Sequence, residues 1–258
     1  MKATIDIGNT NILFAFFINK KVIGSERLKT EEASLSKIEK IMGKYSNLEK
    51  IIISSVVPLT DKLLISYLNS KSLKFLLLKD LVENFKFKTN IRNRNEIGDD
   101  RIVNMIYAKK LFGNSVIVID FGTATTLDVL DRNGVYSGGV ITPGIDLSLN
   151  SLKKMTAKLP LVKFKRTKNI VGKNTVQAIQ SGFFWGYVSM IEGLINKLNK
   201  EKNDRFKVVL TGGNANFFKK MFKNISITDD LFTSRALNYI VSEVNKWNFP
   251  KMILYSFP

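Results

Sequence analysis

The chain has 258 residues, with no cysteine and no histidine. This absence excludes disulfides, zinc–thiolate sites, cysteine nucleophiles and histidine general bases, so acid–base chemistry would fall to Asp, Glu, Lys or Tyr. The composition is 45% hydrophobic and 24% charged, as in a typical globular protein. No stretch approaches the ~20 apolar residues of a membrane span. The chain is predicted to enter a strand almost at its first residue, which leaves no room for a signal peptide. We therefore expect a cytoplasmic protein.

The formal net charge of +18 raises the question of nucleic-acid binding. The lysines are scattered along the whole chain, without a basic run that interleaves aromatic residues and without zinc-finger spacing. We therefore interpret the charge as a compositional bias and expect neither nucleic acid nor a membrane as a partner. A basic protein nevertheless attracts anionic substrates such as nucleotides.

The first half of the chain predicts strands that alternate with helices. One helix begins after Ser34, a candidate N-cap, with Leu35 and Ile38 on its apolar face, and the next begins at Pro58. The expected elements are a strand over 2–6, a hairpin of strands over 12–17 and 21–28, a helix over 35–45, a strand over 51–55, a helix over 58–69, a strand over 75–78, a loop over 83–97 and a helix over 99–112.

The second half repeats this plan. The expected elements are a strand over 116–120, a hairpin of strands over 125–131 and 135–141, a helix that Pro143 starts and that runs to 157, an irregular basic segment over 158–173, a helix over 174–199, a strand over 206–210 and helices over 215–222 and 234–245. Each half gives a three-stranded meander followed by helices and strands, which indicates an internal duplication of about 115 residues. We predict an α/β fold of two duplicated lobes, residues 1–113 and 114–258, with a ligand between them.

The two predicted central strands end in related motifs. The first runs into DIGNTN from Asp6, and the second runs into DFGTATT from Asp120. Glycine permits a tight turn and a close approach of backbone to a phosphate oxygen, and backbone amides beside Thr or Asn can line an anion. The carboxylate at the strand end can bind a cation. One such motif could be an ordinary capped turn, but two copies at matching places favour a nucleotide site.

Four further segments carry polar residues or paired glycines at element ends. The sequence GDDR from Gly98 opens a helix, where acidic residues also act as caps, but Arg101 in a first turn opposes the helix dipole and suits a carboxylate or phosphate ligand. Since the chain has no histidine, an Asp in this segment is the best candidate for a general base. TGGN from Thr211 and GGVITPG from Gly138 place paired glycines where backbone can lie against a ring or a phosphate, or form ordinary turns. Thr175 caps the long helix or reaches a ligand.

Together these motifs resemble those of the type III pantothenate kinases. The resemblance rests on DIGNTN, GDDR, DFGTATT, GGVITPG, GKNTVQAIQSG from Gly172 and TGGN, in this order, from Asp6 to Asn214. It implies the superfold of actin, the sugar kinases and the heat-shock chaperone ATPases, which is ribonuclease H-like, with the nucleotide between two duplicated lobes. It also implies a homodimer that binds pantothenate near the subunit interface.

The resemblance implies roles for individual residues. Asp100 matches the catalytic aspartate, and Asp120 matches the ligand of a monovalent cation, usually potassium. The pantothenate-binding positions would be Gly98, Asp99, Asp100, Arg101 and Thr175. The ATP-binding positions would be Asp6, Ile7, Gly8, Asn9, Thr10, Asn11, Ile12, Leu13 and Thr123. This chain departs from the family at Asp99, where alanine is usual, at Ile91, where tyrosine is frequent, and at Arg94, where proline is common.

The expected reaction is phosphoryl transfer from ATP to the primary hydroxyl of pantothenate, which gives 4′-phosphopantothenate and opens coenzyme A synthesis. Asp100 would accept or orient the hydroxyl proton, Mg²⁺ would bridge the β- and γ-phosphates, and K⁺ or NH₄⁺ near Asp120 would offset developing charge. Arg101 would bind the pantothenate carboxylate. Two alternatives remain: another small-molecule kinase of the same superfold, or a regulatory protein that keeps the nucleotide fold and acts as a transcriptional accessory factor without kinase activity.

Overall fold

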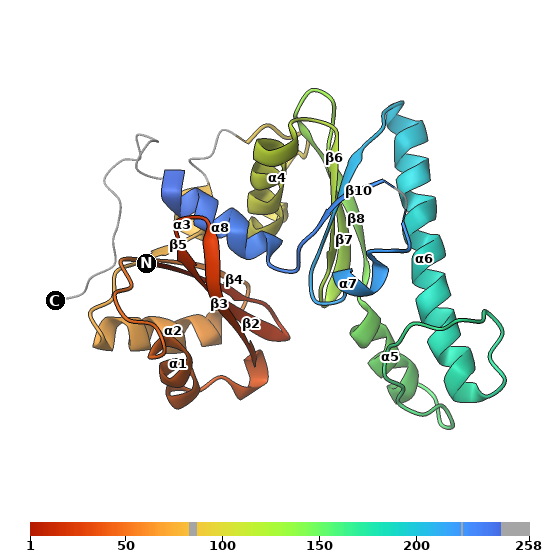
Figure 1. Cartoon of the computed structure of the whole chain (residues 1–258), viewed down its shortest axis with the longest axis horizontal. Coiled ribbons are helices and arrows are strands. Elements are labelled where there is room, and N and C mark those ends of the chain that lie inside the picture. Colours follow the sequence, from red (N-terminus) through yellow and green to blue (C-terminus); the bar gives the residue numbers. More distant parts are fainter. Residues whose placement is uncertain (83–86, 223, 244–258) are drawn as a thin grey trace. The chain divides into compact units, whose positions relative to one another are not determined.

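The computed structural model describes residues 1–82, 87–222 and 224–243 (Figure 1). These residues form two compact units, each built on its own five-stranded sheet. The first unit takes its described residues from Met1–Phe87, from Asn95–Tyr107 and from Leu231 onward, and the second comprises Lys88–Arg94 and Ala108–Asp230. The lobes proposed from the repeat, residues 1–113 and 114–258, stay a prediction from the sequence.

The first unit is a mixed sheet in the order β3-β2-β1-β4-β5. Its central strand β1 pairs antiparallel with β2 and parallel with β4. Helices α1 and α2 bury their apolar side chains against one face of the sheet, and α8 packs against β1, β2 and β4 (Figure 1). The elements are β1 (Lys2–Ile7), β2 (Asn11–Ile18), β3 (Lys21–Lys29), a 3-10 turn (Thr30–Glu32), α1 (Leu35–Met42), β4 (Lys50–Ser55), α2 (Pro58–Ser70), β5 (Phe75–Leu77), α3 (Lys79–Val82) and α8 (Phe232–Glu243).

The second unit has a sheet in the order β10-β9-β6-β7-β8. Its central strand β6 pairs antiparallel with β7 and parallel with β9. A 3-10 turn (Arg94–Glu96) precedes α4 (Asp99–Phe112), which begins in the first unit and ends in the second. The remaining elements are β6 (Val116–Phe121), β7 (Ala124–Leu130), β8 (Tyr136–Pro143), α5 (Ile145–Lys154), α6 (Thr175–Lys202), β9 (Lys207–Thr211), α7 (Ala215–Phe218) and β10 (Ile225–Thr228).

The two sheets have the same plan, as expected for an internal duplication. In each sheet a three-stranded meander continues into two parallel strands, so β1, β2, β3, β4 and β5 correspond to β6, β7, β8, β9 and β10. Asp6 and Asp120 are each the penultimate residue of the central strand. In the parallel neighbour, the residue in register is Ser54 for Asp6 and Thr211 for Asp120. The repeated motifs therefore occupy equivalent places in the two units.

Several sequence-based boundaries were wrong. Pro143 does not start a helix but ends β8, because it pairs with Ala124 of β7, and α5 begins only after Gly144. Leu35 was expected on the buried face of α1, but its side chain is 49% exposed. The residues that α1 buries are Ile38 and residues of the turn after it. Strand β10 was missed because its four residues alternate too briefly to give a pattern.

Most other expectations for the elements are confirmed. Ser34 caps α1 by accepting a hydrogen bond from the Lys37 amide, and the segment over 158–173 is irregular. This segment is fixed to α6, because Gln180 donates to the Lys163 carbonyl and Ser181 donates to the Ile170 carbonyl. The expected loop over 83–97 and helix over 234–245 each extend partly outside the described residues. No helix in the described part of the chain is long and apolar enough to cross a membrane.

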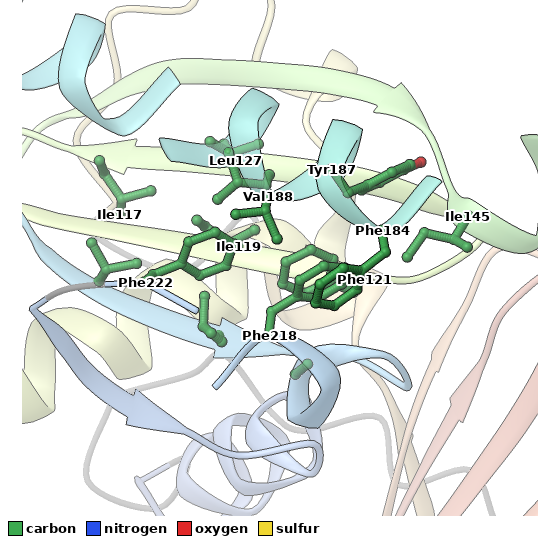
Figure 2. Close-up of a cluster of buried hydrophobic side chains, with 14 of the residues drawn as sticks. Ile117, Ile119, Phe121, Leu127, Ile145, Phe184, Tyr187, Val188, Phe218 and Phe222 are labelled. Atoms are coloured by element: carbon green, nitrogen blue, oxygen red, sulfur yellow. The ribbon is translucent and has the colours of Figure 1, made fainter. Parts of the chain in front are cut away.

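A stack of aromatic rings forms the core of the second unit (Figure 2). Phe218 is fully buried at its centre, with its ring centroid 4.7 Å from that of Phe121 and 6.2 Å from that of Phe184. Tyr187 of α6 stacks against the same ring. The aromatic residues of α6 therefore hold this helix on the sheet, as burial of large apolar surface requires.

Replacement of Phe218 by alanine is expected to destabilise the protein strongly. The loss should be roughly 3–5 kcal/mol in the free energy of unfolding, because a fully buried ring leaves a cavity. The neighbouring Phe217 is 41% exposed, so Phe217→Ala is the matched control and should cost much less. Urea denaturation followed by circular dichroism measures both variants, and equal losses would contradict the assignment of Phe218 to the core.

Candidate active site

The first glycine turn joins β1 to β2 and is held by Thr30, the residue after β3. The Gly8 amide donates to the Asn11 carbonyl at 2.9 Å, the Thr30 amide donates to the Thr10 carbonyl at 3.0 Å, and the Thr30 hydroxyl donates to the Gly8 carbonyl at 2.7 Å. The side chains of Asn9, Thr10 and Asn11 are exposed. A short, braced turn with exposed polar side chains suits an anion such as a phosphate.

The side chains of three other residues of the predicted phosphate loop lie in the protein interior. Ile7, Ile12 and Leu13 are buried, and Ile7 and Ile12 belong to the apolar core of the first unit. Only their backbone groups could reach a ligand. Their side chains instead fix the ends of the two strands that carry the turn.

Asp6 lies just before this turn and is partly buried. Burial raises the pKa of its carboxyl group to about 7, and the negative charge of Asp100 raises it further, whereas a hydrogen bond from Ser54 and the charge of Arg27 oppose the shift. Asp6 and Asp100 are therefore close enough to interact electrostatically. Two carboxylates that raise each other's cost of ionisation favour a shared proton or a bound cation.

The residues Gly98 to Arg101 form the start of α4. The Asp100 Oδ1 accepts a hydrogen bond from the Arg101 amide at 2.8 Å, and the Arg101 amide also contacts the Gly98 carbonyl at 3.0 Å. A Cβ atom on Gly98 would lie 2.6 Å from Asp100 Oδ1. Gly98, Asp99, Asp100 and Arg101 are all half-buried. Asp100 thus accepts a hydrogen bond within the first turn of its own helix, and this bond restrains its carboxylate.

The second turn joins β6 to β7 and lies against the glycine after β9. Gly212 has a φ of +88°, and a Cβ there would lie 2.7 Å from the Phe121 backbone and closer still to Asp120 Oδ1. Only glycine permits this conformation and this approach. One oxygen of the Asp120 carboxylate therefore lies beside the turns that Gly122 and Gly212 form, while the residue is partly exposed.

Thr123 lies in the same turn, with an exposed side chain. Its carbonyl accepts a hydrogen bond from the Gly144 amide at 2.9 Å. A Cβ on Gly144 would lie 2.8 Å from the Thr123 carbonyl carbon and closer to the carbonyl oxygens of Gly122 and Thr123. The corner between β8 and α5 therefore supports the turn directly and fixes the backbone that carries the exposed Thr123 side chain.

A cavity of about 320 Å³ lies in the second unit beside Asn214, the last residue of the TGGN motif. Phe164 and Phe217 form one side, with their rings edge to face at a centroid distance of 5.1 Å. The lining residues are Asp146, Leu149, Asn150, Leu161, Val162, Lys163, Phe164, Asn214 and Phe217. Apolar walls with a few polar groups suit a flat heterocyclic ring.

Thr175 is the first residue of α6 and is exposed. It does not cap the helix, because Asn174 does so: its side-chain oxygen accepts a hydrogen bond from the Gln177 amide at 2.9 Å. Ile91 belongs to a short segment that pairs with Tyr136, and its Cδ1 would lie 3.2 Å from a Cβ on Gly138. Ile91 therefore covers one of the paired glycines of β8.

Metal ions would have to be held by few protein ligands. Among residues 1–82, 87–222 and 224–243, no group of three or more acidic side chains is arranged to hold a metal ion. Mg²⁺ commonly binds through one or two carboxylates, water and substrate phosphates. The close pair of Asp6 and Asp100, with its unfavourable mutual charge, fits this kind of site better than a protein-only metal cage.

Sequence reasoning missed Ser54 and the aromatic cavity. Ser54 is 3% exposed and hydrogen-bonds Asp6 from the neighbouring parallel strand. The only signal was its position at the end of a predicted strand, which does not reveal its register. Phe164 lies in the irregular basic segment, where no periodicity distinguishes a cavity wall from an exposed side chain.

Comparison with known proteins gives a consistent result. The family model described as type III pantothenate kinase matches residues 3–197. A type III pantothenate kinase of Persephonella marina is 41% identical over 84% of this chain and 88% of its own length. A solved Campylobacter jejuni protein assigned to the Baf family of transcriptional activators is 23% identical, with a TM-score of 0.62 over 95% of this chain and 99% of its own.

A more distant structure supports the superfold. The activator of 2-hydroxyisocaproyl-CoA dehydratase from Clostridium difficile, solved with bound ADPNP, is 14% identical, with a TM-score of 0.50 over 95% of this chain and 96% of its own. Solved structures of this kind give the chain the α/β fold of actin, the sugar kinases and related ATPases. The family model covers most of the chain and the curated relatives exceed 30% identity, so the chain belongs to the type III pantothenate kinase family.

Proposed function

We propose that this protein transfers the γ-phosphoryl group of ATP to the primary hydroxyl of pantothenate, giving 4′-phosphopantothenate, the first step of coenzyme A synthesis. The observation that carries this proposal is the pair of half-buried carboxylates, Asp6 and Asp100, beside a braced glycine turn in the first unit. Such a pair beside an anion-binding turn supplies a base and a cation ligand for phosphoryl transfer.

Each turn has its own role in this proposal. Backbone amides of Gly8 to Asn11 would bind phosphate oxygens of ATP, with exposed Asn9 and Thr10 adding side-chain donors. In the second unit, Thr123 would contact the nucleotide from a turn whose backbone Gly144 supports. The cavity beside Asn214 would take the adenine ring, because its size and its aromatic wall suit a purine.

Pantothenate would bind near the start of α4. Asp100 would accept the proton of the attacking hydroxyl or orient that hydroxyl, and Arg101 would bind the carboxylate of pantothenate through its planar guanidinium group. Gly98 and Asp99 would complete the site from the same helix start, and Thr175 would contribute from the start of α6. We also propose that the protein acts as a homodimer.

Two cations would complete the chemistry. Mg²⁺ would be held by the phosphates with the carboxylates of Asp6 and Asp100 nearby, and it would neutralise charge on the transferred group. A monovalent cation, K⁺ or NH₄⁺, would lie near Asp120, which offers a carboxylate beside two glycine turns. A regulatory protein without kinase activity is not favoured, because such a protein needs no pair of interacting carboxylates beside a glycine turn.

The variant Asp100→Asn is expected to lose turnover while it still binds ATP. Loss of a general base should lower kcat by roughly 10²–10⁴-fold, whereas the phosphate turn stays intact. A coupled assay for ADP with and without pantothenate measures turnover, and calorimetry with ADP measures binding. Glu39→Gln is the control, since this exposed carboxylate pairs with Lys71, which follows the last residue of α2. Normal turnover by Asp100→Asn would remove Asp100 from its role.

The variant Asp6→Asn is expected to be more stable than the native protein at neutral and higher pH. The unfolded-state pKa of an aspartate is about 3.9, and the pKa of Asp6 in the folded protein is about 7. Between these values the folded chain keeps a proton that the unfolded chain has released, so stability falls as the pH rises from about 4 to about 7.

The asparagine variant should lack this pH dependence. Its gain at pH of about 8 should be on the order of 2 kcal/mol, since each pKa unit corresponds to about 1.4 kcal/mol and solvent offsets part of the shift. Urea denaturation of both proteins across this pH range, without Mg²⁺, measures the difference. A gain that is the same at every pH would contradict the raised pKa.

Turnover is expected to depend on a monovalent cation through Asp120. The native protein should be faster in potassium or ammonium chloride than in sodium chloride of equal ionic strength, because the larger cations fit a site made of a single carboxylate and backbone oxygens. In Asp120→Asn this difference should disappear. Initial rates in the three salts test the expectation, and equal rates for the native protein would argue against a cation at Asp120.

A further inference from the structure

Tyr187 of α6 reaches from the core of the second unit to the corner between β8 and α5. Its ring is 8% exposed and stacks on Phe218 at a centroid distance of 6.3 Å. Figure 2 shows it at the edge of the aromatic cluster, with its hydroxyl oxygen directed away from Phe121 and Phe218. The ring therefore serves the core, while the hydroxyl is presented to another part of the unit.

The Tyr187 hydroxyl donates a hydrogen bond to the carbonyl of Pro143, the last residue of β8. Ser148 of α5 hydrogen-bonds the same hydroxyl, and the Thr125 hydroxyl, which is buried without a partner of normal hydrogen-bond geometry among the described residues, faces it as well. Burial raises the pKa of Tyr187 despite these hydroxyls, so the group stays protonated and able to donate at neutral pH. This hydroxyl thus connects α6 to the end of β8, beside the hydroxyls of Ser148 in α5 and Thr125 in β7.

This corner is the support of the turn that carries Thr123. Gly144 follows Pro143 directly, and its amide donates to the Thr123 carbonyl at 2.9 Å. Gly144 also lies so near the carbonyls of Gly122 and Thr123 that no side chain fits there. A displacement of Pro143 would therefore pass to the Thr123 turn through rigid backbone contacts.

In the first unit, the residue that supports the equivalent turn also supplies a hydroxyl group. There, Thr30 follows β3, and its amide donates to the Thr10 carbonyl at 3.0 Å, as the Gly144 amide does to Thr123. Thr30 adds a second bond from its own hydroxyl to the Gly8 carbonyl at 2.7 Å. Gly144 has no side chain with which to make such a bond, and the second unit obtains a hydroxyl at this corner from α6 instead.

We propose that Tyr187 is a positioning residue for the nucleotide: its hydroxyl holds the β8–α5 corner so that the Gly122–Thr123 turn keeps the geometry in which it contacts ATP. This role rests on the proposed kinase function, because Thr123 is the expected ATP contact. Tyr187 itself touches neither the phosphates nor pantothenate in this proposal. Its loss should weaken nucleotide binding and leave the chemical step and pantothenate binding unchanged.

The variant Tyr187→Phe tests the proposal, since it keeps the buried ring and removes only the hydroxyl. The KM for ATP, and the Kd for Mg·ADP measured by calorimetry without pantothenate, should both rise roughly three- to tenfold, which is the effect expected for one buried hydrogen bond. The kcat and the KM for pantothenate should not change. Ser148→Ala, which removes a second partner of the same hydroxyl, should give a smaller shift in the same direction and serves if Tyr187→Phe does not fold.

Tyr136→Phe is the matched control. Tyr136 is also fully buried, and its hydroxyl donates to Asp128 Oδ1 at 2.7 Å in the same sheet, away from the corner. The variant Tyr136→Phe should lower the melting temperature without changing the affinity for Mg·ADP. Unchanged affinity in Tyr187→Phe, or an equal loss of affinity in both tyrosine variants, would show a merely structural hydroxyl and overturn the proposal.

If the native protein binds Mg·ADP but does not phosphorylate pantothenate, the proposed function fails, while the binding measurements still decide the role of Tyr187.

Discussion

The electrostatic strain between Asp6 and Asp100 is the constraint on which the first unit depends. The strand β1 ends by placing a carboxylate in a partly buried position, and the start of α4 places a second carboxylate near it. Ser54 and Arg27 relieve only part of the cost. A fold selected for stability alone would put an amide or an apolar residue at one of these positions. In the proposed function, a magnesium-bound nucleotide would supply the positive charge that two interacting carboxylates favour.

The second unit meets a different constraint, which is close backbone packing around Asp120. Here the same strand position carries a carboxylate, but glycines replace side chains on both sides of it. Gly212 in a left-handed conformation lets the loop after β9 approach, and Gly144 lets the β8–α5 corner approach the next turn. Such packing fixes backbone oxygens and amides at the cost of conformational entropy. The duplicated motif thus places two interacting carboxylates in the first unit, and closely packed backbone around one carboxylate in the second.

Much of this arrangement could be predicted from the sequence, because the motifs are short and contiguous. The turns at Gly8 and Gly122, the helix start at Gly98 and the repeated order of elements follow from local patterns. Ser54 could not be found in this way, since its contact with Asp6 depends on the register between two parallel strands. The strand ending at Pro143 was misjudged for a related reason: proline favours a helix start locally, but the pairing of β8 with β7 decides the conformation. Contacts set by register or by long-range packing leave no short-range signal.

The two units have the same order of strands, but their equivalent turns are held in different ways. Both turns are supported by an amide from the residue after the third strand of the meander, Thr30 in one unit and Gly144 in the other. In the first unit the supporting residue also supplies the hydroxyl, so one residue holds the turn through both its amide and its side chain. In the second unit the hydroxyl comes from Tyr187, so the turn is coupled to α6 and to the aromatic core.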